Sequence, residues 1–366
     1  SRFVKFVHGC CSAPLRDVDI RLVGHRVPYI QGGLDNPNQD MPYWEQRNRL
    51  ADISQRMTGR VHLVAGWHDL FVCQQLQDYL ELRKHGNEVS LTVGPWHHWQ
   101  IGTFIQFVIR TIIQEYQRQF LGMTIEEEGT LMPSHAPEKP VHIFVSGEGA
   151  EHWRALAAWP PPSSQRSLFL APRNELTEVP ATDEQPDHSA YTFDPADPTP
   201  SVGGYSFNPW NAGQVDHKRL ESRSDVLSFS YGPLTEALEI IGSPLADISF
   251  SSSLPSADLC VKLCAVSPRG KCHNICEGYV RSALEPNSVT RVQVELGPTA
   301  HRFAPRWSLR VLVCSGAHPR IARNSGTGRK GGEMGAETEA LAGSMRVHHS
   351  AQHPSKISLP IFVGEA

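Results

Sequence analysis

The chain has 366 residues and a formal net charge of −4 at pH 7, with 40% hydrophobic and 20% charged residues. At about 150 residues per domain, this length predicts two or three domains with enough apolar residues for a substantial core. The small charge offers no basic surface for nucleic acid, and no apolar run approaches the roughly 18 residues that span a bilayer. We therefore expect a globular protein with neither nucleic acid nor membrane as a partner.

The first part of the chain predicts helices followed by a strand–helix–strand series. Helical and loop patterns end at Gly59, and the apolar run Val61–Ala65 predicts a buried strand. A helix is expected from about Leu70 to His85, and a second strand over Val89–Val93. Such a series implies parallel neighbours, so the loops after both strands emerge at one edge of the sheet, where open α/β sheets hold active sites. A further helix, over about residues 101–121, is apolar on more than one face and is expected to be buried.

From Val141 onward the pattern changes to short alternating runs separated by Pro, Gly and Asp. The runs are Val141–Val145, Ser167–Leu170, Val226–Phe229, Ala246–Phe250, Val292–Leu296 and Leu309–Val313. No long helical pattern lies between them, which predicts an all-β sandwich or jelly roll. Residues 182–204, rich in Asp and Pro, are expected to form a long ordered loop. The fold class is therefore predicted as α/β plus all-β.

Two polar side chains follow the two predicted parallel strands. Asp69 ends the segment Gly66-Trp67-His68-Asp69, and His98 ends Gly94-Pro95-Trp96-His97-His98. A carboxylate that orients an imidazole, and an imidazole that takes a proton, are two of the three members of a nucleophilic triad. In the alternative interpretation, the pair caps helices at the rim of the sheet, with Asp69 as an N-cap. His97 competes with His98 for the role of the base.

No nucleophile for such a triad is found in the sequence. No glycine is followed by Ser two residues on and Gly four residues on, so the strained G-x-S-x-G turn is missing. Gly204-Tyr205-Ser206 lacks the second glycine. In an α/β-hydrolase, further strands separate the serine from the acid, and the segment between Ser12 and Asp69 is too short to contain them. Cys10 and Cys11 are no better placed as thiol nucleophiles.

The chain has eight cysteines, and four of them are candidate metal ligands. Cys260, Cys264, Cys272 and Cys276 have a spacing that invites a zinc interpretation. However, Cys260 and Cys264 fall in one predicted strand, where residues four apart are about 13 Å apart. We therefore expect no metal and no cofactor, and buried thiols in a reducing, cytoplasmic compartment.

The sequence resembles the cocaine esterase / X-Pro dipeptidyl-peptidase superfamily of α/β-hydrolases in motifs that occur in family order. Gly66–Asp69 with Gly94–His98 resembles its G-W-x-D…G-P-W-x-H segment. Further matches are Trp153 with Trp159–Pro162, Tyr191–Pro198 with Gly203-Gly204, Pro233–Glu236, Ser315–Arg320 with Arg323-Asn324, and His353–Pro360. The resemblance implies that Asp69 is the triad acid, that His98 is the triad base and that Phe71 lines the acyl pocket.

The resemblance also implies a domain division and an activity. Residues 1–58 correspond to the tail of a helical cap, 59–132 to the C-terminal part of an α/β-hydrolase domain, and 133–366 to a jelly-roll β-sandwich. The family's nucleophile turn and oxyanion-hole tyrosine have no counterpart in the chain. We expect the C-terminal portion of a serine hydrolase that acts on a small ester or short peptide through an acyl-serine intermediate.

Two alternatives to this expectation remain open. One is an X-Pro dipeptidyl-peptidase, which needs a site for a free α-amine, and the other is an inert binding or assembly module. Because a partial sheet leaves an unpaired edge and apolar faces, we also expect poor solubility or a homo-oligomer.

Overall fold

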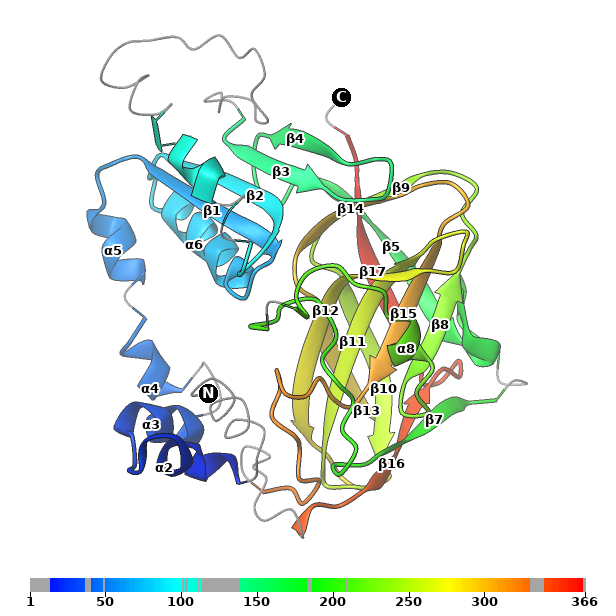
Figure 1. The fold of residues 1–366 in the computed structure, drawn as a ribbon. Coiled ribbons are helices and arrows are strands. Elements are labelled where there is room, and N and C mark those ends of the chain that lie inside the picture. Colours follow the sequence, from blue (N-terminus) through cyan, green and yellow to red (C-terminus); the bar gives the residue numbers. More distant parts are fainter. Residues whose placement is uncertain are drawn as a thin grey trace.

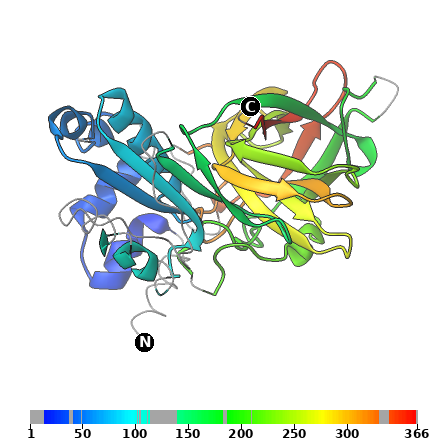
Figure 2. The ribbon, with the colours of Figure 1, turned by 90° about the horizontal axis from the view of Figure 1, so that it is seen from above.

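The computed structural model describes residues 14–36, 41–48, 50–100, 102, 105–110, 112–113, 139–182, 186–208, 210–329 and 339–364. Two bodies lie side by side in it, a small sheet with helices and a large β-sandwich (Figures 1 and 2). Cys10, Cys11 and Ser12 lie outside the described residues. Among the described residues, no helix combines the length and apolar character that crossing a membrane requires.

Short helices precede the first sheet, as the sequence predicts. They are η1 (Leu15–Asp17), α2 (Val18–Val23), α3 (Pro28–Asp35), α4 (Pro42–Glu45) and α5 (Leu50–Arg56). The buried carboxylate of Asp19 holds this region together, because it accepts hydrogen bonds from the backbone N–H of Val27 at 2.7 Å and from Gln31 Nε2 at 2.8 Å. α5 packs against the helix that connects the first two strands, and so links the short helices to the sheet.

The first sheet confirms the predicted strand–helix–strand series. β1 (Val61–His68) and β2 (Val89–His97) are parallel, and α6 (Val72–Lys84) connects them. The sheet continues with β3 (Val141–Val145), parallel to β2, and β4 (His152–Leu156), antiparallel to β3. α6 covers the sheet with a buried stripe at helical spacing, formed by Val72, Leu76, Tyr79 and Leu82. β1 is an edge strand of this sheet, and whether that edge drives self-association stays a prediction for light scattering to test.

The expected burial of the helix over residues 101–121 is wrong for the part that the structure describes. Residues 105–110 and 112–113 are helical, but Ile105, Ile109, Ile112 and Ile113 are each about half exposed or more. Apolar side chains on several faces indicate that a helix needs cover, but they do not indicate which element supplies it. Within the described residues these four isoleucines are therefore not part of a core.

The second body is a β-sandwich whose strands contain the predicted alternating runs, with one exception. The run Val141–Val145 forms β3 of the first sheet, because it pairs with β2, so its assignment to the sandwich is wrong. Its strands are β5 (Ser163–Ala171), β6 (Glu175–Thr177), β7 (His188–Phe193), β8 (Leu227–Tyr231), β9 (Leu238–Gly242), β10 (Leu245–Ser252), β11 (Ser256–Val266), β12 (Cys272–Ala283), β13 (Thr290–Glu295), β14 (Thr299–Phe303), β15 (Ser308–Cys314), β16 (Gly343–His348) and β17 (Lys356–Phe362). Two short helices, η2 (Pro172–Asn174) and α8 (Lys218–Glu221), lie in its connections. The core between the layers includes Phe229, Phe250, Val261 and Phe303, all fully buried.

The strand order shows how distant segments meet in this sandwich. The described strands follow the order β12-β11-β15-β8-β6-β5-β17-β10-β16-β7, with β13 paired to β10 and β9 to β14 and β17. Cys260 and Cys264 both lie in β11, as predicted. The expectation of a loop over residues 182–204 is wrong in part, because β7 lies within it. Tyr191 and Phe193 in β7 point into the core, and pairing with β16 outweighs the turn-forming composition around them.

The two bodies are joined through the backbone at the end of β3. Ser146 donates its N–H to the carbonyl of Ala300 at 2.9 Å and accepts a hydrogen bond from the N–H of Arg302 at 2.7 Å. Gly147, with φ +142°, follows at the contact, where a Cβ would overlap the carbonyl of Arg302. β3 and β4 lie after residue 133 in the chain, but they pair within the first sheet and not within the sandwich. The domain division at residue 133, which was drawn from the sequence, stays a prediction.

Candidate active site

The parallel pairing of β1 and β2 brings Asp69 and His98 to one edge of the sheet. Asp69 directly follows β1, and His98 directly follows β2. The register pairs Gly66 with Gly94 and His68 with His97, with a bulge between them. Because both strands run in the same direction, their carboxyl ends and the side chains that follow share one rim.

The two side chains meet there, as the spacing predicts. His98 Nδ1 lies 3.1 Å from Asp69 Oδ2, and both side chains are partly buried. The other carboxylate oxygen, Oδ1, accepts the backbone N–H of Phe71 at 2.9 Å. Since a carboxylate can only accept, His98 must donate from Nδ1, and its Nε2 keeps the lone pair that a general base needs.

The glycines of the motif are explained by one tryptophan. A Cβ on Gly66 would overlap the carbonyl oxygen of Trp96, and a Cβ on Gly94 would overlap the ring of the same residue. The Trp96 ring packs at a tilt against the rings of Phe107, at 4.9 Å, and Trp153, at 6.1 Å between centroids. The close approach of the two strand ends, which positions Asp69 and His98, therefore depends on residues without side chains.

Aromatic rings surround the imidazole of His98. Their centroids lie 5.6 Å away for Phe71, 5.8 Å for Trp99 and 5.3 Å for Phe207. Trp99 fixes Phe207 by donating Nε1–H to its backbone carbonyl at 2.7 Å. Phe71 and Phe207 are both more than half exposed, so they form an apolar wall that is open to solvent. Phe207 was missed at the sequence level, because it comes from a loop more than a hundred residues downstream and carries no local signal.

The neighbouring histidines have other surroundings. His97 Nδ1 accepts the backbone N–H of Trp99 at 3.3 Å, so this atom is engaged away from Asp69. Burial lowers the pKa of His97, and the nearby His98 lowers it further against the opposing effect of Asp69. His68 is buried, and burial together with His97 lowers its pKa to about 4. A histidine that stays neutral at pH 7 in this way is a packing residue at the rim.

The described residues supply no nucleophile for this pair. Ser206, in the segment that came closest to the expected motif, is buried, and its Oγ accepts the backbone N–H of Asn208 at 3.1 Å. Over the described ranges, no hydroxyl or thiol hydrogen-bonds to His98. A hydrogen-bonded acid–imidazole pair at the carboxyl edge of a parallel sheet is a geometry that α/β-hydrolases use.

Comparisons with known proteins agree with this class. The family model described as X-Pro dipeptidyl-peptidase C-terminal non-catalytic domain matches residues 134–358, and the one described as X-Pro dipeptidyl-peptidase (S15 family) matches residues 24–100. The chain therefore belongs to the cocaine esterase / X-Pro dipeptidyl-peptidase superfamily of α/β-hydrolases.

Individual relatives show the same relation. Cocaine esterase from Rhodococcus sp. (strain MB1 Bresler) is 28% identical over 93% of this chain and 62% of its own length. Two solved structures share the fold. An α-amino acid ester hydrolase matches with a TM-score of 0.82 and 22% identity, over 98% of this chain and 64% of that chain. An aminopeptidase from a marine sediment archaeon, Thaumarchaeota archaeon, matches with a TM-score of 0.80 and 20% identity, over 98% of this chain and 63% of that chain. The chain thus spans less than two thirds of the length of each of these proteins.

Proposed function

We propose that the protein containing this chain is a serine hydrolase that cleaves small esters or amides through an acyl-serine intermediate, with Asp69 and His98 as the acid and base of its triad. The observation that carries the proposal is the hydrogen bond of 3.1 Å between His98 Nδ1 and Asp69 Oδ2. The family of the chain supports it, as does the name of the curated relative, a cocaine esterase.

The chemistry follows from the orientation of the imidazole. His98 Nε2 takes the proton of a serine hydroxyl supplied from outside the described residues, while the serine oxygen attacks the carbonyl carbon. The imidazolium then gives that proton to the leaving alkoxide or amine, and a water molecule releases the acyl group in the same way. Asp69 stays ionised and stabilises the imidazolium.

The aromatic wall suggests where the acyl group lies. Phe71 and Phe207 flank the imidazole and are exposed, so an apolar acyl group of the substrate can pack on them next to the reacting carbonyl. Phe71 is thus proposed as a substrate-binding residue. The substrate class is a small ester or short peptide, and no metal or organic cofactor is needed for these steps.

The test uses the protein with the additional length that its relatives have, and compares two adjacent histidines. His98→Ala is expected to lower kcat for a p-nitrophenyl ester by about 10⁴-fold or more, because the base is lost. His97→Ala, the matched control, should keep activity within about tenfold. The opposite pattern would assign the base to His97 and overturn the proposal.

A second candidate function, an X-Pro dipeptidyl-peptidase, is favoured by the two family models that match the chain. Comparing hydrolysis of a Gly-Pro anilide with that of an aryl ester by the same protein distinguishes the two activities. A fluorophosphonate probe covers the remaining alternative. Labelling that is lost in His98→Ala indicates an enzyme, whereas absence of labelling indicates an inert binding or assembly module.

A further inference from the structure

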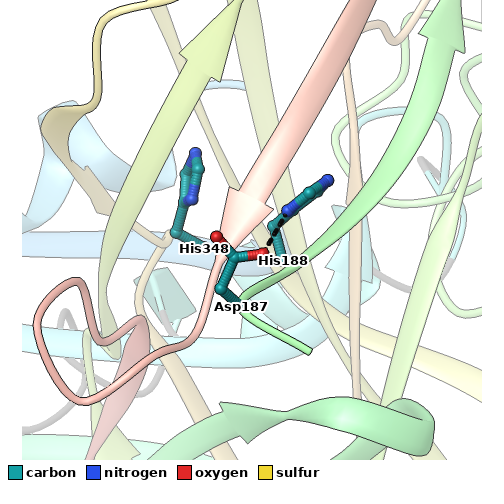
Figure 3. A group of neighbouring side chains, drawn as sticks. All are labelled: Asp187, His188 and His348. Atoms are coloured by element: carbon teal, nitrogen blue, oxygen red, sulfur yellow. Dashed lines mark hydrogen bonds and ion pairs between the residues drawn. The ribbon is translucent and has the colours of Figure 1, made fainter. Parts of the chain in front are cut away.

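A second cluster of polar side chains lies on β7 and β16 of the β-sandwich, apart from the sheet that carries Asp69 and His98 (Figures 1 and 3). Asp187 immediately precedes β7, His188 is the first residue of β7, and His348 is the last residue of β16. The antiparallel register places His348 directly opposite His188. Each of the three residues offers one atom that can bind a metal ion, and these atoms all lie within 4.8 Å of one another.

The spacing of these atoms is close to that of a metal site. Ligand atoms bound about 2.0–2.2 Å from one zinc ion lie about 3–4 Å apart. The Asp187 carboxylate lies between the two imidazole rings, and His188 Nδ1 is 2.6 Å from Asp187 Oδ1 (Figure 3). The side chains of Asp187 and His188 are 66% and 35% exposed, so both can make the small shift that coordination requires.

His348 is fixed before any ion arrives. Its side chain is buried, and its Nε2 is 2.8 Å from the Oγ of buried Ser251. Its backbone carbonyl accepts the hydroxyl of Ser355 at 2.5 Å, and Ser355 is itself fully buried. With Nε2 engaged, Nδ1 is the nitrogen left for an ion. A hydrogen bond to the second ring nitrogen is the usual support of a metal-binding histidine.

The backbone also holds the two halves of the cluster together. The N–H of His349 donates to the carbonyl of Asp187 at 2.9 Å, directly beside the paired histidines. β7 ends the strand path of the described sandwich and pairs only with β16 among the described strands. An ion shared by Asp187, His188 and His348 would therefore connect an edge strand to its neighbour.

We propose that Asp187, His188 and His348 bind one divalent transition-metal ion of the zinc type and that this ion fastens β7 to β16. Two imidazoles and one carboxylate are a donor set that suits Zn²⁺, whereas Mg²⁺ and Ca²⁺ favour oxygen ligands alone. The fourth position is left for water. The role is structural, because the cluster lies on β7 and β16 of the sandwich, whereas Asp69 and His98 follow strands of the other sheet (Figure 1).

The test measures zinc binding to the chelator-treated protein by titration calorimetry. One zinc ion per chain is expected, together with a higher melting temperature in ZnCl₂ than in MgCl₂, because a ligand that binds the folded state stabilises it. His188→Gln, at a partly exposed side chain, and Asp187→Asn, at an exposed one, should each weaken zinc binding at least tenfold. His25→Gln, which changes an exposed histidine away from the sandwich, is the matched control and should bind as the parent does.

Cobalt substitution separates this site from the buried cysteines of the sandwich. Co²⁺ bound by Asp187, His188 and His348 should show visible d–d absorption without the near-ultraviolet charge-transfer band of a thiolate ligand, and the visible absorption should be lost in His188→Gln. Absence of zinc binding, or equal zinc binding in the parent, His188→Gln and Asp187→Asn, would overturn the proposal.

Discussion

Asp69 serves two partners with its two oxygens, and this contradicts the alternative in which it is the N-cap of the following helix. α6 begins after Phe71, and no side chain caps it, so Asp69 is not its N-cap. Instead, Asp69 Oδ1 accepts the N–H of Phe71, two residues on, and Oδ2 accepts the imidazole N–H of His98. The local hydrogen bond fixes the carboxylate, so that its second oxygen is already oriented toward the histidine.

This arrangement makes a prediction for Asp69→Asn. The N–H of Phe71 needs an acceptor, so the amide oxygen should stay there and the NH₂ group should turn toward His98. The imidazole proton should then move from Nδ1 to Nε2, which removes the lone pair that a base uses. Long-range ¹H–¹⁵N spectra of ¹⁵N-histidine protein report the tautomer, with the His98 signals assigned by their loss in His98→Gln.

The matched control for this experiment is Glu88→Gln, which removes one carboxylate from an exposed side chain elsewhere on the first sheet. It should leave the tautomer of His98 unchanged. If Nδ1 stays protonated in Asp69→Asn, the orientation derived for the pair is wrong.

At the scale of the elements, the close approach of β1 to β2 depends on two glycines, which have no side chain to fill the space between the strand ends. Gly66 and Gly94 are paired in the register, and Trp96 occupies the space above both. The carbonyl of Trp96 belongs to the backbone and cannot rotate away, so the contact at Gly66 is the stricter of the two. A methyl group at this position must push the strands apart.

We therefore predict that Gly66→Ala lowers the free energy of unfolding by about 1–3 kcal/mol, the usual cost of overpacking. Urea denaturation followed by tryptophan fluorescence measures the effect. Gly59→Ala is the control, since a Cβ there has no atom within 4 Å, and it should change stability by less than about 0.5 kcal/mol. Equal stability of the two variants would contradict the steric account.

At the scale of the whole molecule, histidines are buried where the parts of the chain pack together. Burial is the main cause that lowers the pKa of His68 and His217 to about 4 and that of His301 to about 3. His301, in β14, lies in the segment that joins the end of β3 to the sandwich. His217 donates Nε2–H to the carbonyl of Val202 at 2.9 Å. Each of these imidazoles is neutral in the folded protein.

These pKa values predict a loss of stability in acid. The folded pKa lies below the unfolded value near 6.5, so below pH 6.5 the unfolded chain binds protons that the folded protein does not. Stability is therefore fully present above pH 6.5 and falls as the pH decreases toward 4. Between pH 7 and pH 5 the loss is about 2 kcal/mol per buried histidine.

Urea denaturation at pH 7 and pH 5 tests this prediction. His301→Phe removes one titrating ring, and should reduce the difference between the two pH values by about 2 kcal/mol. His25→Phe, at an exposed position, should leave the difference unchanged. An unchanged difference in His301→Phe would show that this ring is not kept neutral by burial.

The sequence predicts those features of the fold whose cause lies in a few neighbouring residues. The strand–helix–strand series and the runs of the sandwich follow from side-chain periodicity within a few residues, and they are confirmed in β1, α6, β2 and the later strands. The meeting of Asp69 and His98 was also predictable, because parallel strands joined by one helix must end at the same edge. The catalytic roles of these two residues remain a proposal.

The tertiary structure alone decided the features that need distant segments. Phe207 reaches His98 across more than a hundred residues, and β7 forms in an Asp- and Pro-rich segment because β16 offers a partner. The exposure of Ile109 and the meeting of His188 with His348 have the same origin. Periodicity records which side chains need a neighbour, but only the packed chain determines which neighbour each one receives, because that choice depends on strand order and register.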